Sequence, residues 1–212
     1  GVECTTGPLG QGFGMSTGMA FAETFLRHVL KEKLNEAKGL VDHYTYALVG
    51  DGDMQEPITL GAASLAGHLG LSHLIVYYDS NEIQISGGVS RSDSTNYATV
   101  FEGFGWHVQE IDGHNHEAIR TAIEKAQVMD KPSIIIGKTI MARGSAGMEG
   151  DHNTHGSPLP QDEIDATKDK LGLAPIVFNV PNEVINHFQS RFESMETVVG
   201  DWKKQLSVCR KN

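Results

Sequence analysis

The chain has 212 residues, of which 39% are hydrophobic, so it can bury a core as one large or two small domains. A formal net charge of −10 argues against a nucleic-acid partner, because proteins that bind phosphate backbones carry a basic face. Two cysteines give no disulfide framework, and neither an apolar run of about 18 residues nor an export signal is present, so we expect a cytoplasmic protein without a membrane span.

The first residues are rich in glycine and lead into a helical pattern. The chain begins with Gly1 and not with Met, and it runs directly into the glycine-rich stretch, so we expect a fragment that is incomplete at its N-terminus. Apolar residues at helical spacing then predict a helix from about Phe13 to Leu34. They are Met15, Met19, Ala22, Leu26, Val29 and Leu34.

A strand, a helix and a second strand follow. Tyr44 to Val49 is a β-rich run that ends in Gly50-Asp51-Gly52, where glycine permits a sharp turn and the close approach of a ligand. The second strand, Leu74 to Tyr78, ends in Asp79-Ser80-Asn81. This strand–helix–strand unit is typical of a parallel sheet. The helix between the strands is predicted by a stripe of Ile58, Ala62, Leu65 and Leu69.

The same alternation continues and places the chain in the α/β class, with a parallel sheet flanked by helices. Ligands of such sheets bind beyond the carboxyl ends of the strands, so we expect Asp51 and Asn81 to lie at one binding edge. The further predicted elements are a helix over 97–104, a strand over 106–111, a helix over 116–128 and a strand over 133–139.

The last third of the chain has a different character. Residues 141–160 are rich in Gly, Ser, His and Asp and predict a long loop, which is often functional. A helix over 161–171 and an extended linker over 174–181 follow. Apolar residues then recur at steps of three and four, a pattern that indicates either ordinary packing or a seam for another helix or domain. These residues are Ile185, Phe188, Phe192, Met195, Val199, Trp202 and Leu206.

Asp51 and Asn81 provide the ligand types of a hard cation. Magnesium and calcium take oxygen ligands from carboxylates, amides and backbone carbonyls, and magnesium often bridges to a diphosphate. A helix that begins at Gly52 would point its first amides at the same anion. Taken alone, Gly-Asp-Gly is more often a simple turn. The spacing to Asn81, across one strand–helix–strand unit, favours the cation site.

These residues resemble the signature of thiamine diphosphate enzymes, in which Asn follows Gly-Asp-Gly by about thirty residues. The resemblance implies that the metal, Mg²⁺ or Ca²⁺, is held by Asp51, Asn81 and the backbone carbonyl of Ile83. The run from Thr5 to Gly12, Thr-Thr-Gly-Pro-Leu-Gly-Gln-Gly, is similar to a segment of the transketolase family. A nicotinamide fingerprint is disfavoured there, because Met15 follows where a third glycine is required and no strand precedes the motif.

Further similarity to transketolases lies in residues 64–69, 78–81, 113–114 and 155–159, whereas Pro57 and Ser86 depart from the family pattern locally. The resemblance implies a diphosphate- and metal-binding domain over 1–173, followed over 174–212 by a linker and a helix that leads toward a second domain. It implies cofactor contacts from Gly7, Pro8, Leu9, Gly50, Asp51, Gly52, Glu56, Asp79, Asn81, Ile85 and His155.

The resemblance implies transfer of a two-carbon glycolaldehyde unit from a ketose phosphate to an aldose phosphate through thiamine diphosphate, with His155 as the catalytic residue of this chain. The chain alone is expected to be inactive and to need a homodimer of the full enzyme or a separate pyrimidine-domain chain. Two alternatives stay open: a non-catalytic half-subunit of a split enzyme, and another thiamine enzyme such as deoxyxylulose phosphate synthase. A zinc site at His152 and His155 is disfavoured, since no further ligand is evident.

Overall fold

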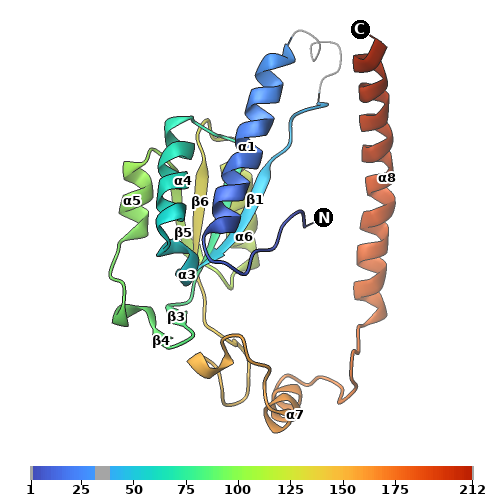
Figure 1. Ribbon diagram of the computed structural model, residues 1–212. Helices are drawn as coiled ribbons and strands as arrows, with labels where there is room; N and C mark the ends of the chain where they lie inside the picture. The colour runs from blue at the N-terminus through green and yellow to red at the C-terminus, as the bar shows by residue number, and fades with distance from the viewer. Residues whose placement is uncertain (1, 32–38, 212) are drawn as a thin grey trace.

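The fold is built on a four-stranded sheet in which all strands run parallel. The computed structural model of the protein describes residues 2–31 and 39–211. The strand order is β1-β2-β6-β5, so the chain places its first strand at one edge and crosses over with a helix before each later strand (Figure 1). The strands are β1 (Thr45–Gly50), β2 (Leu74–Ser80), β5 (His107–Asp112) and β6 (Ser133–Lys138).

Helices cover both faces of this sheet, which confirms the predicted α/β class. Three of them, α1 (Gln11–Val29), α4 (Pro57–His68) and α5 (Tyr97–Gly103), pack on one face, and α6 (His116–Gln127) packs on the other (Figure 1). Successive side chains of β2 point to opposite faces of the sheet, so each face has its own cluster of buried hydrophobic residues. Leu74 and Val76 belong to the larger cluster, under α1, α4 and α5, and Ile75 belongs to the cluster under α6. The predicted strands and helices are thus present within two residues of their expected bounds, except that α1 ends at Val29 with Leu30 as its C-cap, well before the predicted end at Leu34. Residues 32–34 of that prediction lie outside the described residues.

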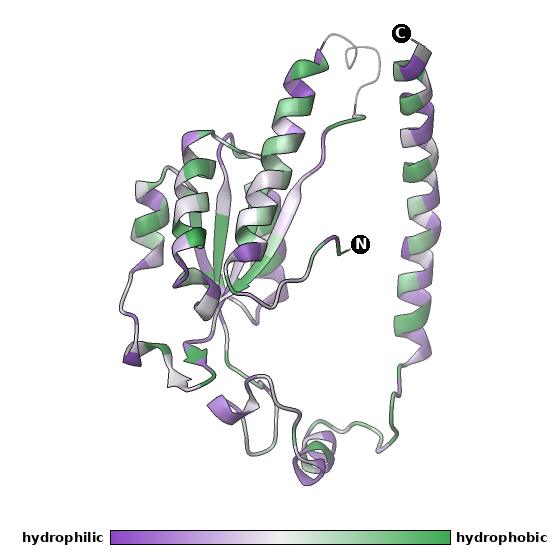
Figure 2. Cartoon of the chain, viewed as in Figure 1, coloured by the Kyte–Doolittle hydropathy of each residue, from purple (hydrophilic) through white to green (hydrophobic). Residues whose placement is uncertain are grey.

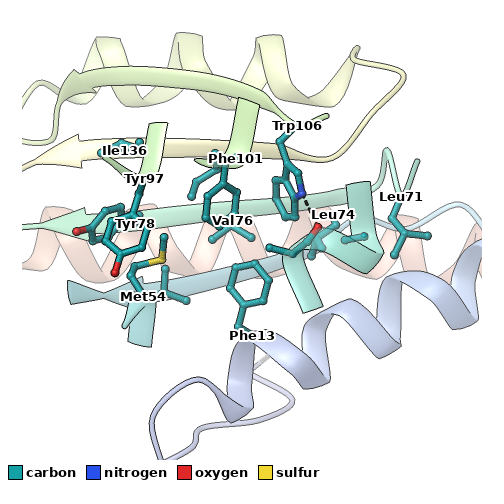
Figure 3. Close-up of a cluster of buried hydrophobic side chains, with 14 of the residues drawn as sticks. Phe13, Met54, Leu71, Leu74, Val76, Tyr78, Tyr97, Phe101, Trp106 and Ile136 are labelled. Carbon is teal, nitrogen blue, oxygen red and sulfur yellow. Dashed lines mark hydrogen bonds between the residues drawn. The ribbon is translucent and has the colours of Figure 1, made fainter. Parts of the chain in front are cut away.

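An aromatic group fixes the larger core. The rings of Phe13 and Phe101 lie 6.0 and 5.0 Å from the ring of Trp106, so α1, α5 and the start of β5 meet around one indole (Figure 3). The Trp106 indole N–H donates to the carbonyl of Ala63 at 2.8 Å, which satisfies the polar atom of a buried tryptophan. This contact holds α4 against the sheet.

Apart from Ala62, which packs against it, the described apolar residues that predicted α1 and α4 do not face this core. Met15 and Leu26 in α1 are 46% and 43% exposed, and Ile58 and Leu65 in α4 are 49% and 52% exposed. Small residues face the sheet in their place: Ser16, Thr17 and Ala20 from α1, and Thr59, Ala63 and Ala66 from α4. Small side chains let the helix axes approach the sheet closely, and the larger apolar residues form an uncovered outer surface.

The remaining elements lie around the sheet, and the longest of them stands apart. Helix α8 (Asn182–Lys211) runs beside the body with polar and apolar residues mixed along it (Figure 2), and the Trp202 indole N–H donates to the carbonyl of Leu40 at 3.1 Å. None of the described helices is long and apolar enough to span a membrane. The other elements are α3 (Asp51–Met54), β3 (Ile83–Gln84), β4 (Gly87–Gly88), η1 (Val89–Arg91), η2 (His152–Thr154) and α7 (Gln161–Lys170).

Candidate metal and cofactor site

Asp51 lies where the sequence predicts a binding edge. It begins α3 directly after β1, and the parallel register pairs Gly50 with Asp79 at the end of β2. The two strands therefore deliver Asp51 and the loop after Ser80 to the same edge, at the carboxyl ends of the strands. Asp51 and Asn81 are brought together as expected.

The carboxylate of Asp51 is buried and fully engaged by neutral donors. Asp51 is 4% exposed. Its Oδ1 accepts a hydrogen bond from the Tyr78 hydroxyl at 2.6 Å, and its Oδ2 accepts from the backbone N–H groups of Asn81 at 3.2 Å and Glu82 at 3.0 Å. Burial raises the pKa of Asp51 above its ordinary value, although these three hydrogen bonds act in the opposite direction. A buried anion with uncharged partners lacks a countercharge, and a bound cation would supply it.

The loop after β2 is shaped by its own side chains. Asn81 Oδ1 accepts from the N–H of Ile83 at 3.0 Å, while its amide Nδ2 donates to Asp79 Oδ2 at 3.2 Å. Between Asn81 and Ile83, Glu82 has a φ of 62°, which is uncommon for a residue with a side chain. Such backbone strain is often found at functional sites, and here it lets the N–H of Glu82 reach Asp51.

Asp79 is oriented from the neighbouring strand. The Thr139 hydroxyl donates to Asp79 Oδ1, and the Thr139 N–H donates to the carbonyl of Ser80 at 3.2 Å. Because Asp79 Oδ2 accepts from Asn81, Thr139 acts on Asn81 through Asp79. Thr139 was not predicted, because it lies beyond the last residue of β6 and its contact depends on the sheet register.

A second aspartate joins the glycine-rich segment to the same edge. Asp53 accepts from the N–H of Gly10 at 2.8 Å and from the N–H of Gly50 at 2.9 Å. Gly10 has a φ of 75°, and a Cβ there would come within 2.8 Å of Glu56 Cβ. Asp53 was not predicted, although its place three residues after Gly50 is that of an acidic capping-box residue.

This link places several predicted cofactor residues together. A Cβ at Gly52 would lie 3.0 Å from Leu9 Cδ1, so the Leu9 side chain packs against the first turn of α3. Glu56 precedes α4 and lies against Gly10. Gly10 and Gly52 therefore leave room for the side chains of Glu56 and Leu9.

Two predicted residues lie away from this cluster. Ile85 is 76% exposed between β3 and β4, and His155 is exposed after η2. In the described ranges no hydrogen bond or ion pair joins His155 to Asp51 or Asn81, so its predicted role stays a prediction. Nor do His152 and His155 gather a third metal-ligating side chain among the residues the structure describes.

A polar cavity opens beside Asp51. It has a volume of about 560 Å³ and is lined by Asp51, Tyr78 and Glu82 together with residues of the 88–98 segment. Glu110 and Lys138, from β5 and β6, line it as well. A ligand that enters at the carboxyl ends of the strands therefore has open space next to the buried carboxylate.

Comparisons with known proteins agree with this geometry. The transketolase thiamine diphosphate-binding domain family matches residues 1–212. The transketolase of Bacillus subtilis is 44% identical over 211 residues, which cover 98% of this chain and 31% of the relative. The crystal structure of Campylobacter jejuni transketolase superimposes with a TM-score of 0.88 at 38% identity, over 98% of this chain and 32% of that one.

A third relative was solved with a sugar phosphate. The transketolase of Pichia stipitis in complex with sedoheptulose 7-phosphate gives a TM-score of 0.88 at 32% identity, over 100% of this chain and 31% of that one. The chain thus spans about a third of the length of the curated relatives and structures that it matches.

Proposed function

The chain belongs to the transketolase family through its thiamine diphosphate-binding domain, and on this premise we propose that it is the diphosphate- and metal-binding part of an enzyme that moves a glycolaldehyde unit from a ketose phosphate to an aldose phosphate. The observation that carries the proposal is the buried Asp51 carboxylate, which has only neutral hydrogen-bond partners and lies at the carboxyl ends of parallel strands. When bound, thiamine diphosphate supplies the carbon–carbon bond chemistry. The protein residues described here bind and orient it.

We propose that Asp51, Asn81 and the backbone carbonyl of Ile83 hold Mg²⁺ or Ca²⁺. The oxygen-rich donor set suits a hard cation, and the charge of the ion would offset the cost of keeping Asp51 ionised while buried. Asp79 and Thr139 fix the amide of Asn81, so that its position does not depend on the ligand.

The proposed cofactor contacts come from several segments. Gly7, Pro8 and Leu9 belong to the N-terminal segment, in which Leu9 lies against Gly52, and Gly50 and Gly52 flank Asp51. Glu56 precedes α4, Asp79 and Asn81 lie at the end of β2, and Ile85 lies between β3 and β4. His155 is the proposed catalytic residue from the 141–160 loop. A phosphate at the start of α3 would meet free backbone N–H groups, which favour anions.

Sugar phosphates are the proposed substrates. This is supported by the Pichia stipitis enzyme, whose structures include complexes with fructose 6-phosphate and sedoheptulose 7-phosphate. The chain covers 31% of those structures, so residues that recognise the sugar are expected in other parts of the complete enzyme.

The uncovered apolar residues support a partner for this chain. Met15, Met19, Ile58 and Leu65 line the outer side of α1 and α4, and each is more than a third exposed. We propose that this surface and α8 are covered in a homodimer of the full enzyme or by a separate pyrimidine-domain chain. A half-subunit of a split enzyme would bury the same surface.

Calorimetry tests the proposal. Thiamine diphosphate should bind the 212-residue chain weakly, only with Mg²⁺ or Ca²⁺ present, and not at all after Asp51→Asn. Asp130→Asn, which removes an exposed carboxylate outside the site, is the matched control and should bind like the parent. Metal-independent binding that survives Asp51→Asn would refute the assignment.

Tight binding by the isolated chain would show instead that the second half of the site is not required. An assay of two-carbon transfer from a donor ketose, using the complete enzyme or the chain with its pyrimidine-domain partner, then separates transketolase from other thiamine enzymes.

A further inference from the structure

A second cluster of ionisable side chains lies at the opposite end of the sheet from Asp51. Glu23 is in the second half of α1, whereas Asp51 is the first residue of α3, which lies near the start of α1 (Figure 1). Glu23 is 1% exposed, and its side chain is completely buried. A carboxylate this deeply buried requires a positive partner, because burial without one is costly.

His73 and Asp42 face Glu23 from the amino ends of β2 and β1. His73 Nδ1 lies 3.3 Å from Glu23 Oε1, and His73 Nε2 lies 3.9 Å from Asp42 Oδ1. One ligand atom from each of the three residues lies within 4.8 Å of the others. The His73 ring is held against the ring of Tyr44, with centroids 4.5 Å apart, and the His73 carbonyl accepts from Thr45 N–H at 2.8 Å.

Two buried atoms of this cluster make no hydrogen bond. Glu23 Oε1 and His73 Nδ1 are both buried and make no hydrogen bond of good geometry, although Oε1 lies within ion-pair distance of Arg27 and of His73. Buried polar atoms are nearly always hydrogen-bonded, and an exception often marks the position of an ion or a water. Glu23 Oε2 accepts from the Thr24 hydroxyl at 3.3 Å, so Oε1 is the oxygen that faces His73 and Arg27.

We propose that Glu23, Asp42 and His73 form a site for a divalent transition-metal ion of the zinc class, separate from the cofactor site. An imidazole nitrogen with two carboxylate oxygens is a ligand set that Zn²⁺ accepts, whereas Mg²⁺ and Ca²⁺ prefer oxygen alone. The ion would bind Glu23 Oε1 and His73 Nδ1 and would take over from Arg27 the neutralisation of Glu23. Asp42 is the exposed ligand, with a side chain that is 59% exposed, so it gives the ion a route from solvent.

Arg27 is the competitor for this position. Its Nε lies 3.2 Å from Glu23 Oε1, one helical turn along α1, and its side chain is 41% exposed. Arg27 can therefore swing into solvent when an ion binds. The ion and the guanidinium compete for one carboxylate oxygen, so removing Arg27 should strengthen metal binding.

The experiment titrates Zn²⁺ into the 212-residue chain carrying Asp51→Asn, which removes the first cation site. We expect one Zn²⁺ per chain by calorimetry. His73→Gln and Asp42→Asn should each weaken binding at least about tenfold, and Arg27→Gln should leave it unchanged or tighter. The control His187→Gln, at an exposed histidine of α8, should have no effect.

Cobalt(II) gives an independent readout, because a bound nitrogen–oxygen site absorbs in the visible range. The band should be present in the parent and in Arg27→Gln and absent in His73→Gln. Equal Zn²⁺ affinity in the parent, His73→Gln and Asp42→Asn would overturn the proposal, as would a chain that binds no Zn²⁺. Asp42 is exposed, so its variant keeps the test valid even if His73→Gln fails to fold. Neither result bears on thiamine diphosphate binding, which is measured separately.

Discussion

At the level of single residues, Asp51 is held in a state that disfavours its charge. Its burial raises its pKa, and three neutral hydrogen-bond donors offset the cost only in part. An ionised and buried Asp51 lowers the stability of the fold when no cation is bound, and a bound cation removes this cost. The same residue should therefore oppose folding and enable metal binding.

This leads to a prediction for Asp51→Asn. When folding raises the pKa of a carboxyl group, the folded state is most favoured below the pKa of the unfolded state, about 3.9. This contribution to the unfolding free energy is lost as the pH rises through the pKa of the folded state. The asparagine variant does not titrate, so its unfolding free energy relative to that of the parent should rise between pH 4 and pH 7, where the parent carries a buried charge. Urea unfolding of parent and variant without metal, at both pH values, measures this difference in unfolding free energy.

Asp130→Asn is the control for that experiment, because Asp130 is exposed. This variant should have nearly the same unfolding free energy as the parent at both pH values. A variant that is less stable than the parent at pH 7 would mean that Asp51 stabilises the chain without a cation.

Tyr78 gives a second prediction at this scale. Its hydroxyl is the 2.6 Å donor to Asp51 Oδ1, so Tyr78→Phe leaves a buried carboxylate oxygen unsatisfied and should cost about 1–3 kcal/mol of unfolding free energy. Tyr97→Phe is the matched control. The Tyr97 hydroxyl donates to Asp93 at 2.6 Å, but Asp93 is only half-buried, so water can replace the lost hydrogen bond and the loss should be smaller. Equal losses would show that Asp51 does not depend on Tyr78.

At the level of elements, the sequence predicted which segments form helices and strands but not which side of a helix is buried. Periodic apolar residues located α1 and α4 correctly, because an amphipathic pattern favours a helix whatever covers its apolar side. The core-facing residues are small ones such as Ala20 and Ala63, which carry little hydrophobic signal. The β3–β4 hairpin was missed because its strands are two residues long and pair through Gly87 and Gly88.

The candidate site, too, could be predicted only in part. Asp51 and Asn81 follow consecutive parallel strands, and this topology alone brings them together. Tyr78 and Thr139 were not predicted, because their contacts depend on strand register and on side-chain direction. The Tyr78 contact depends on the register of β1 against β2, and the Thr139 contact on that of β2 against β6. No periodicity in a sequence specifies such contacts.

A glycine in α4 provides the prediction at this scale. A Cβ at Gly67 would lie 1.9 Å from the backbone carbonyl oxygen of Phe104, so Gly67→Ala must displace α4 from the turn before β5. We expect a loss of at least about 2–3 kcal/mol of unfolding free energy, comparable to overpacking a core. Thermal and urea unfolding measure it.

The control lies in the same helix. A Cβ at Gly61 would meet nothing within 4 Å, so Gly61→Ala should stabilise the chain by about 0.5–1 kcal/mol, as expected for alanine in a helix interior. If both substitutions had the same sign, the close contact of α4 with the Phe104 carbonyl would be disproved.

At the level of the whole molecule, the chain divides into a packed body and a C-terminal segment with little packing. The loop before α7 is tied to that helix, because the N–H groups of Gly147 and Met148 both donate to Glu163 Oε1 and the Lys170 ammonium donates to the carbonyl of Ser145. Over the described residues from 174 to 210, by contrast, no side chain is buried. We propose that the boundary predicted at residue 173 marks this change.

This contrast gives the last prediction. Removing residues 174–212 deletes α8 and breaks two recorded hydrogen bonds to the body, from Trp202 to Leu40 and from Lys168 to Ile176, both at exposed positions. Exposed hydrogen bonds contribute little, so the midpoint of thermal unfolding should change by no more than about 2 °C. Removing residues 161–212 also deletes the α7 anchors of the loop that carries His155, and it should lower the midpoint by several degrees more. Scanning calorimetry of the three chains decides between these outcomes. A large drop on the shorter deletion alone would mean that α8 packs on the body in solution and that the boundary at 173 is wrong.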